Sequence, residues 1–292
     1  MVEVMTVIAE RARAKVNLTL RVHGRREDGY HLLESLIVFA DVGDKVMFRP
    51  GAAPAVTVSG PYVGAITGRN LVDTTLERLA AADPALTLGA VEIEKGLPIA
   101  AGIGGGSADA AAVLRAVRTV NPQSTIDWHA IATSLGADVP VCLADCSALV
   151  WGVGEHIEPL PALASLNAVL VCPMAAAPLE KTRTVFRQLT VPPLEHTNPP
   201  VLPPSLHDVD ELVAHMRGIG NDLRAAAHAI MEQSAWAEAA LAAKPGCQYV
   251  SLSGAGPTSY GIFADAAAAA DAADSLKAHH PDWWIIATTL GN

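Results

Sequence analysis

The chain has 292 residues, of which 51% are hydrophobic and 17% charged, and its formal net charge at pH 7 is −10. This length suits two domains, and the composition allows a large core and argues against a disordered chain. The acidic balance argues against a nucleic-acid binder, which needs a basic face. A small anionic ligand remains compatible with it, because a few cations and backbone N–H groups suffice to hold one.

Cysteine usage and hydropathy predict a reduced, soluble protein. The four cysteines form no CxxC pair and no metal-binding spacing with histidine, so we expect mostly buried thiols: Cys142, Cys146, Cys172 and Cys247. The N-terminal segment lacks the apolar core and cleavage site of a secretory signal. Residues 159–179 are uncharged and long enough to span a bilayer, but four prolines and Asn167 interrupt them. We therefore expect a cytoplasmic location and no membrane partner.

The first half of the chain mixes short strands with helices. The alternation in KVNLTLRV (15–22) predicts a half-buried strand, and VEIEK (91–95) alternates in the same way. Helical spacing predicts a helix over 69–82. The glycine-rich stretch PIAAGIGGGSADAA (98–111) leads into a second predicted helix from about residue 107 to residue 118.

The second half predicts an α+β layer. AVLVCP (168–173) has the composition of a short buried strand. CQYVSLSG, a glycine turn and TSYGIFA predict two strands of a hairpin, followed by a helix over about 264–278 and a last strand in DWWIIATTL. This order fits an antiparallel sheet with helices on one face. A proline-rich boundary near 159–161 divides the chain into predicted domains 1–158 and 159–292.

The glycine-rich stretch has the composition of an anion-binding loop. Four glycines (Gly102, Gly104, Gly105 and Gly106) stand within five residues, followed by Ser107. It is neither a P-loop, because no lysine precedes Ser107, nor a dinucleotide fingerprint, which needs glycine at 107. Glycines nevertheless let N–H groups approach an anion, and a helix adds the positive end of its dipole. Ser107 would cap that helix or give its hydroxyl to a phosphate or a phosphate-bound Mg²⁺. The alternative is a tight strand-to-helix connection in which glycines relieve crowding.

Four stretches in order resemble the GHMP kinases. PIAAGIGGGSADAA resembles their PxxAGLGGGSSDAA phosphate loop, and LSGAGPTSYGIF (252–263) resembles their third motif. ARAKVNLTLRVHGRREDGYHLLES (12–35) and GADVPVCL (136–143) resemble the first motif and the catalytic region of one branch, and DGYH after AKVNL distinguishes that branch. The resemblance implies a two-domain GHMP kinase fold, with an N-terminal ATP-binding domain and a C-terminal α+β domain with an antiparallel sheet.

The resemblance also implies the catalytic residues. Asp138 would take or orient the proton of the acceptor hydroxyl, and Lys15 would be a nearby cation that keeps this carboxylate ionised. From the residues alone, Asp138 is explained as well by a helix or turn cap, and Lys15 by a solvated strand face. Asn17 falls on the same strand face as Lys15 and would hydrogen-bond the acceptor, or would be a strand-edge amide.

The ATP site implied by the resemblance is centred on the glycine-rich stretch. Asn70 and Lys95 match positions near the nucleotide, although a helix-capping Asn and an exposed Lys explain them as well. The loop residues implied to hold ATP are Pro98, Ile99, Ala100, Ala101, Gly102, Ile103, Gly104, Gly105, Gly106, Ser107 and Ala108, with Ser107 as a possible Mg²⁺ contact.

The acceptor site is implied by two other stretches. Tyr30 and His31 would hold a cytosine ring, and Phe186 would be a second aromatic wall unless it packs in the core. In SGAGP, three residues would form a second close-approach loop, with a hairpin turn as the alternative: Gly254, Ala255 and Gly256.

The function implied by the resemblance is an ATP- and Mg²⁺-dependent kinase. It would phosphorylate the 2-hydroxyl of 4-diphosphocytidyl-2-C-methyl-D-erythritol, a cytidyl diphosphate substrate of the non-mevalonate (MEP) isoprenoid pathway. The alternatives are another small-alcohol kinase of the homoserine or mevalonate type, and a non-catalytic nucleotide-binding sensor. We expect no nucleic-acid partner and a monomer or weak homodimer.

Overall fold

The computed structural model describes residues 6–65, 68–160, 163–174, 180–191, 200, 202 and 206–291. The chain forms two compact units that alternate along the sequence. The first unit comprises residues 1–14, 42–99 and 104–145, and the second comprises 15–41, 100–103 and 146–292. The predicted boundary between residues 158 and 159 stays a sequence prediction.

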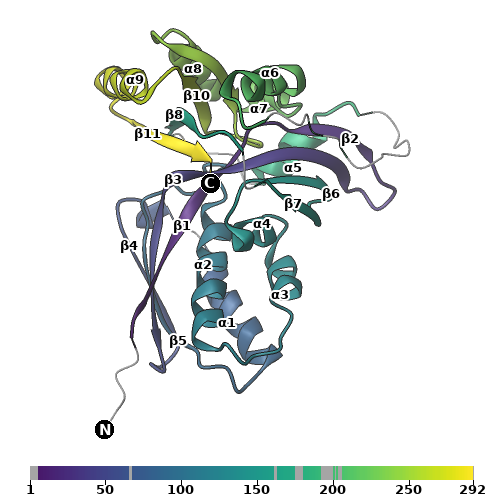
Figure 1. The fold of residues 1–292 in the computed structure, drawn as a ribbon, viewed down its shortest axis with the longest axis vertical. Coiled ribbons are helices and arrows are strands. Elements are labelled where there is room, and N and C mark those ends of the chain that lie inside the picture. The colour runs from purple at the N-terminus through teal and green to yellow at the C-terminus, as the bar shows by residue number, and fades with distance from the viewer. Residues whose placement is uncertain are drawn as a thin grey trace. The chain divides into compact units, whose positions relative to one another are not determined.

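The first unit is a small sheet with helices along one side (Figure 1). Its strands are the first part of β1 (Ile8–Asn17), the second part of β3 (His31–Pro50), β4 (Ala55–Ser59) and β5 (Gly89–Glu94). β3 pairs antiparallel with β5, and β4 pairs parallel with β5. The helical elements are η1 (Val63–Ala65), α1 (Leu71–Ala82), α2 (Gly105–Val120), α3 (Trp128–Leu135) and α4 (Val139–Ala144). The predicted elements at 69–82 and 91–95 are confirmed.

Helix α2 is the central element of the first unit. Seven consecutive residues, 108–114, are buried, so the helix is surrounded on all sides near its start. Five of them are small enough for close packing: Ala108, Asp109, Ala110, Ala111 and Ala112. Interiors are packed to crystal-like density, so this alanine-rich start brings the neighbouring elements close to the beginning of the helix.

The second unit contains an antiparallel sheet. β8 (Leu166–Pro173) lies between β11 (Trp283–Gly291) and β10 (Ser259–Phe263), and β9 (Cys247–Leu252) follows β10. All three pairings are antiparallel, as predicted. The first part of β3 pairs with β11, β2 (Arg21–Arg25) and β6 (Ala148–Gly152), and β6 pairs with β7 (His156–Pro159). Every residue of β8 except Asn167 is buried, which confirms the buried strand expected there.

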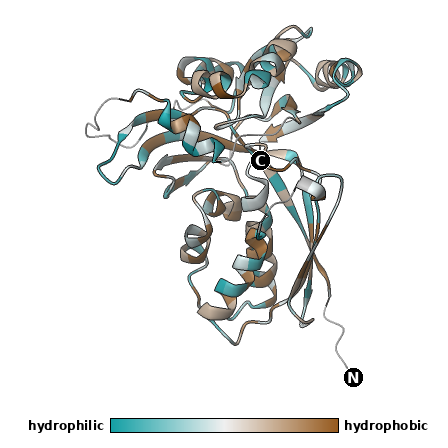
Figure 2. Ribbon diagram, turned by 180° about the vertical axis from the view of Figure 1, so that it is seen from behind, coloured by the Kyte–Doolittle hydropathy of each residue, from teal (hydrophilic) through white to brown (hydrophobic). Residues whose placement is uncertain are grey.

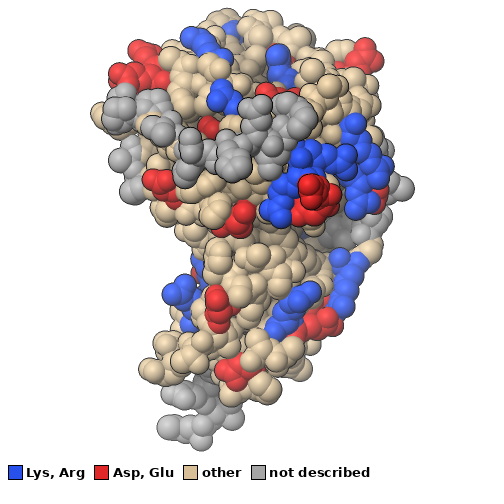
Figure 3. Space-filling view, turned by 90° about the vertical axis from the view of Figure 1, so that its right-hand side faces the viewer, with Lys and Arg blue, Asp and Glu red and all other residues tan. Residues whose placement is uncertain are grey.

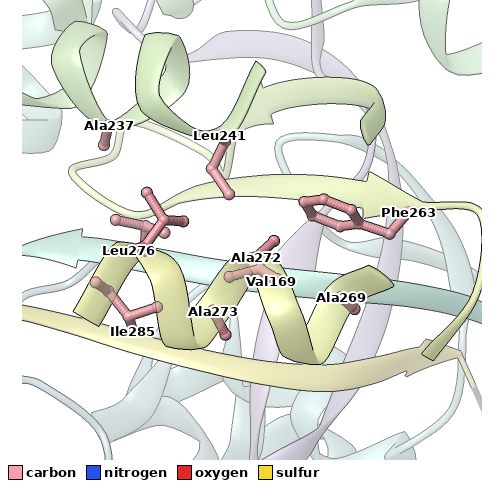
Figure 4. Close-up of a cluster of buried hydrophobic side chains, with 10 residues drawn as sticks. Val169, Ala237, Leu241, Phe263, Ala269, Ala272, Ala273, Leu276 and Ile285 are labelled. Carbon is pink, nitrogen blue, oxygen red and sulfur yellow. The ribbon is translucent and has the colours of Figure 1, made fainter. Parts of the chain in front are cut away.

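Two helices cover this sheet and build its core (Figure 4). Leu241 of α8 (Glu232–Ala242) and Leu276 of α9 (Ala266–His279) pack against Val169, Phe263 and Ile285 of the strands. The remaining helices of the second unit are α5 (Lys181–Arg187), α6 (Val209–Ile219) and α7 (Arg224–Ile230). Figure 2 shows hydrophobic and hydrophilic residues mixed along the helices of both units.

The strand predicted over residues 15–22 is wrong. Residues 15–22 do not form a continuous half-buried strand, because β1 ends at Asn17 and β2 begins at Arg21. All six residues from Lys15 to Leu20 are buried, so both faces of this segment are covered. The polar side chains Lys15, Asn17 and Thr19, which alternation assigns to solvent, are therefore inside the protein.

The cysteines, the surface charges and the hydropathy of the helices complete the description of the fold. Cys142 and Cys172 are buried, and Cys146 and Cys247 are half-buried. Figure 3 shows basic side chains gathered beside acidic ones, and exposed pairs such as Arg26–Asp28 and Arg183–Glu180 contribute little stability each. Within the described part of the chain, no helix is long and apolar enough to cross a membrane.

Candidate active site

The segment Ala100–Ile103 is held by its carbonyl groups. Lys181 Nζ donates to Ala100 O at 2.9 Å, and Thr258 donates to Ala101 O through both its backbone N and its hydroxyl, at 3.1 and 2.7 Å. Ser253 Oγ donates to Gly102 O at 3.3 Å, and the backbone N of Lys15 donates to Ile103 O at 2.9 Å. All four carbonyls are thus bound by other residues of the second unit, to which the segment itself belongs.

The hydrogen bonds to these carbonyls also determine where the N–H groups of the same peptides point. In a trans peptide the C=O and N–H point in opposite directions, so the N–H groups of residues 101–104 face away from the groups that bind the carbonyls. No described residue accepts a hydrogen bond from the backbone N–H of residues 101–107. Consecutive N–H groups without an acceptor form the type of concavity that binds anions.

Helix α2 begins earlier than the sequence predicts, at Gly105 and not at Ser107. Its N-cap is Gly104, in the left-handed conformation with φ 69°, and no side chain caps the helix. The predicted capping role of Ser107 is therefore wrong, because Ser107 already lies within the first turn. Its half-buried hydroxyl has no hydrogen-bond partner among the described residues. A free hydroxyl next to the unpaired N–H groups fits a ligand to a phosphate or to Mg²⁺.

The other residues of the glycine-rich stretch differ in exposure. Pro98, Ala101, Ile103 and Ala108 are buried, whereas Ala100 and Gly106 are exposed. Gly106 has open space around its Cβ position, but a Cβ on Gly102 would lie 2.2 Å from Gly256 O. Gly102 is thus needed for close approach of two backbones, and Gly106 is not.

Lys15 and Asn17 are inside the second unit and contact each other. Lys15 Nζ donates to Asn17 Oδ1 at 3.2 Å, and Asn17 Nδ2 donates to Ser35 Oγ at 2.7 Å. Ser35 in turn donates to Thr19 O at 2.6 Å. The predicted common strand face of Lys15 and Asn17 is confirmed, and the solvated-lysine alternative is wrong because Lys15 is only 5% exposed.

The SGAGP turn lies beside this chain of polar groups. Gly254 and Gly256 have φ of 55° and 71°, which favours glycine at both positions. A Cβ on Gly254 would lie 3.2 Å from Asn17 Oδ1. Ser253 Oγ accepts from Asn17 N at 3.2 Å, and Asn221 Nδ2 donates to Gly254 O at 2.9 Å. Ala255 is buried among apolar side chains, so it contributes packing and backbone.

Asp138 lies in the first unit, directly before α4. It is at the N-cap position of that helix, but its side chain makes no capping hydrogen bond. A side-chain cap of α4, one of the alternatives for this residue, is therefore wrong. Its carboxylate is half-buried.

Lys95 is also inside the first unit. It is 3% exposed, and its ammonium pairs with Asp44 and with Asp109, the latter at 2.7 Å. Asp44 also accepts from the backbone N of Gly96 and Leu97 at 2.7 and 2.8 Å. The exposed-lysine alternative is wrong. Gly96 and Leu97 directly precede Pro98. The hydrogen bonds from their backbone to Asp44 therefore fix the start of the glycine-rich stretch to the buried triad of Asp44, Lys95 and Asp109.

The triad carries two carboxylates for one lysine. Burial raises the pKa of Asp109 to about 7, with the Lys95 ammonium acting in the opposite direction. Asp109 Oδ1 is buried and has no hydrogen-bond partner among the described residues. A protonated Asp109 gives this group no net charge.

Asn70 is a helix cap. Its side-chain oxygen accepts from the backbone N of Val72 at 3.0 Å at the start of α1. The helix-capping alternative is confirmed for this residue, and the contact with a nucleotide stays a prediction.

An aromatic pair joins two distant parts of the sequence in the second unit. The rings of His31 and Phe186 have centroids 4.9 Å apart at an interplanar angle of 30°. Burial lowers the pKa of His31, and the Arg25 guanidinium acts in the same direction, so both favour the neutral imidazole. Tyr30 is 65% exposed, and its backbone is fixed by Asp28 and Arg26. The rings of His31 and Phe186 are therefore paired, and Tyr30 is largely exposed.

Sequence reasoning missed several residues that hold the site. Lys181, Ser253 and Thr258 bind the carbonyls of residues 100–102, and Asp44 and Asp109 enclose Lys95. Ser253 and Thr258 belong to the SGAGPT motif itself, and Asp109 belongs to the glycine-rich stretch. Position within a motif is the only sequence signal that could have identified these three residues, and Lys181 and Asp44 have no such signal.

Comparison with known proteins gives the family. Residues 70–152 match the GHMP kinases N terminal domain, and residues 205–282 match the GHMP kinases C terminal domain. The chain is 44% identical over 280 residues to a 4-diphosphocytidyl-2-C-methyl-D-erythritol kinase of Cereibacter sphaeroides, covering 94% of this chain and 96% of that protein. A kinase of the same name from Rhodopseudomonas palustris is 42% identical over 99% of this chain and 100% of its own length. The chain belongs to the 4-diphosphocytidyl-2-C-methyl-D-erythritol kinase family of GHMP kinases.

Solved structures agree with this membership. A crystal structure of a 4-(cytidine 5'-diphospho)-2C-methyl-D-erythritol kinase is similar with a TM-score of 0.77 at 33% identity, covering 98% of this chain and 100% of that one. Homoserine kinase from Cytophaga hutchinsonii is similar in fold, with a TM-score of 0.67 at 17% identity over 100% of this chain and 97% of its own. The expected two-domain GHMP kinase fold is confirmed, and the chain is an ATP-dependent kinase.

Proposed function

We propose that this member of the family transfers the γ-phosphoryl group of ATP to the 2-hydroxyl of 4-diphosphocytidyl-2-C-methyl-D-erythritol. The observation that carries the proposal is the set of unpaired N–H groups over residues 101–107, in a chain whose full-length relatives carry that kinase's name. Phosphoryl transfer needs a cradle for phosphates, an activated hydroxyl and positive charge. The site residues supply a candidate for each.

The phosphates of ATP would lie on the glycine-rich stretch. The N–H groups of residues 101–107 would donate to phosphate oxygens, and the positive end of the α2 dipole adds to their effect. Mg²⁺ neutralises phosphate charge in such reactions and keeps several waters, so a single protein hydroxyl is a sufficient protein ligand. Ser107 is the residue that would supply it.

Asp138 would accept the proton of the acceptor hydroxyl. Its carboxylate is half-buried and makes no capping hydrogen bond at the start of α4, and a carboxylate within hydrogen-bond reach of a hydroxyl acts as a general base. Lys15 would stabilise negative charge on the transferring group, and Asn17 fixes its ammonium. The cytosine ring would stack in the pair of His31 and Phe186, with Tyr30 as a further aromatic surface.

A substrate panel tests the proposal. The purified chain with ATP and Mg²⁺ is offered the cytidyl substrate, homoserine and mevalonate, and ADP release is measured. We expect turnover of the cytidyl substrate alone. Turnover of homoserine or mevalonate in its place would overturn the proposal, and so would absence of turnover with all three. A cytoplasmic location and a monomer or weak homodimer stay predictions.

A further inference from the structure

Lys181 is a buried lysine in the second unit that joins two motif segments. It is the first residue of α5 and is 9% exposed. Its ammonium donates to Ala100 O at 2.9 Å and also to Gly256 O. It therefore connects the beginning of the glycine-rich stretch with the SGAGP turn.

The charge of Lys181 has no counter-ion within the described residues. Both of its hydrogen-bond acceptors are neutral carbonyls, and no described carboxylate forms an ion pair with it. The neighbouring Cys172 gives no compensation, because burial raises the pKa of that thiol to about 11 and leaves it neutral. Burial lowers the pKa of Lys181 to about 8, whereas a buried ammonium is ordinarily paired.

Lys95 provides the contrast within the same chain. It is buried to a similar extent, but two carboxylates surround it. An ammonium has three N–H donors, and the carbonyls of Ala100 and Gly256 occupy two of those of Lys181. One donor and one uncompensated positive charge of Lys181 thus remain.

We propose that Lys181 is a phosphate-binding residue, and that a phosphate group of a bound ligand supplies the counter-ion that the protein lacks. The inference rests on the proposed function, which brings two sources of phosphate to this enzyme: ATP and the diphosphate of the cytidyl substrate. Both offer the same chemistry to an ammonium, a charge-assisted hydrogen bond to an anionic oxygen. Lys181 would keep its hydrogen bonds to the carbonyls of Ala100 and Gly256, so the same side chain would bind the phosphate and position the two backbone segments.

Proton uptake measured by calorimetry tests the proposal. Each ligand is titrated into the full-length protein at pH 8 in two buffers of different ionisation enthalpy. The probes are a non-hydrolysable ATP analogue with Mg²⁺, cytidine 5′-diphosphate, and cytidine as the ligand without phosphate. An arriving phosphate stabilises the ammonium, so the wild-type protein should take up as much as about half a proton with one of the two phosphate ligands and none with cytidine. The ligand that causes uptake identifies the source.

Variants separate the charge from the contact with the carbonyls. Lys181→Met should bind that ligand about 10-fold or more weakly, without proton uptake. Lys181→Arg keeps a permanent charge, so it should retain affinity within about 3-fold and also lose the uptake. Lys277→Met removes an exposed lysine of α9 and should behave as wild type in both measurements. Thermal unfolding of each variant checks that it is folded, and Lys181→Arg keeps the test valid if Lys181→Met is not.

Three results would overturn the proposal. They are no proton uptake by the wild-type protein with either phosphate ligand, unchanged uptake in Lys181→Arg, and a loss of cytidine affinity in Lys181→Met as large as its loss for both phosphate ligands. The last result would leave Lys181 with a purely positioning role. None of these measurements requires turnover, so failure of the proposed function in the substrate panel is distinguishable from failure of this inference.

Discussion

The ammonium of Lys15 donates to the side-chain oxygen of Asn17 at 3.2 Å, inside the second unit. Asn17 is held from its other side, because its Nδ2 donates to Ser35 Oγ. One amide therefore fixes the position of the lysine that the proposed mechanism places against developing negative charge.

Replacing Asn17 should reduce both stability and turnover, whereas replacing Ser35 should reduce stability alone. Asn17→Ala removes one hydrogen-bond acceptor of Lys15 and one donor to Ser35, which should lower the free energy of unfolding by about 1–3 kcal/mol and kcat by about 10-fold or more. Ser35→Ala is the matched control. It breaks the other end of the same network and should destabilise the protein with kcat within about 3-fold of wild type. Equal effects of both variants on kcat would contradict a specific role for the Asn17–Lys15 contact.

Two glycines of the same stretch should respond in opposite ways. Gly106→Ala places a Cβ in open space within a helix, so the free energy of unfolding should stay unchanged or rise by about 0.5–1 kcal/mol. If the N–H groups cradle phosphates, the same methyl group lies at the ligand, and KM for ATP should rise about 10-fold.

Gly102→Ala is the counterpart of that variant. Its Cβ would lie 2.2 Å from Gly256 O at a φ of 79°, so it should lower the free energy of unfolding by about 2 kcal/mol or more. Urea unfolding and ATP kinetics of both variants test the pair. A Gly106→Ala protein with wild-type KM for ATP would contradict the cradle.

Asp109 should make the stability of the protein depend on pH. Its pKa rises from 3.8 in the unfolded chain to about 7 in the folded protein. Between these values the folded protein binds more protons at this site than the unfolded chain, so the free energy of unfolding falls as pH rises. Asp109→Asn removes this contribution and keeps an oxygen for Lys95. Urea unfolding at pH 4.5 and 7.5 should therefore show a smaller loss of stability in the variant than in wild type. An equal loss in both proteins would contradict a protonated Asp109.

Phe186 should affect one substrate only. Phe186→Ala removes the ring that lies 4.9 Å from His31, so KM for the cytidyl substrate should rise about 10-fold while KM for ATP stays unchanged. Phe186→Tyr keeps the aromatic face and should restore most of the affinity. A rise of both KM values together, or no change in either, would assign Phe186 to core packing.

Much of the fold could be predicted from the sequence, since its strong signals are local. Asn70 before an amphipathic run, and alternating strands around SGAGP, determine elements that the structure confirms. The prediction failed at residues 15–20, where alternation put Lys15 and Asn17 in solvent. Pairing of a strand with distant segments decides which of its faces are covered, and no local pattern records that.

The candidate site likewise has parts that the local sequence predicts and parts that only the structure shows. The glycine-rich stretch can be identified from its composition. The start of α2 at Gly105, and the absence of a cap by Ser107, depend on backbone geometry. The partners of Lys95 and Lys181 lie between 14 and 81 positions away in the sequence, so their burial could not be read from neighbouring residues. Resemblance to GHMP kinases located the motifs, and only the structure identified the groups that hold them.

The most direct test of the proposed mechanism is the turnover of Asp138→Asn with ATP and the cytidyl substrate, measured together with calorimetric binding of an ATP analogue. Asn keeps the shape of the side chain and removes its ability to accept a proton at neutral pH. We predict a kcat at least about 100-fold lower with nucleotide affinity retained. A kcat near that of wild type would contradict the assignment of Asp138 as the proton acceptor, and with it the proposed mechanism.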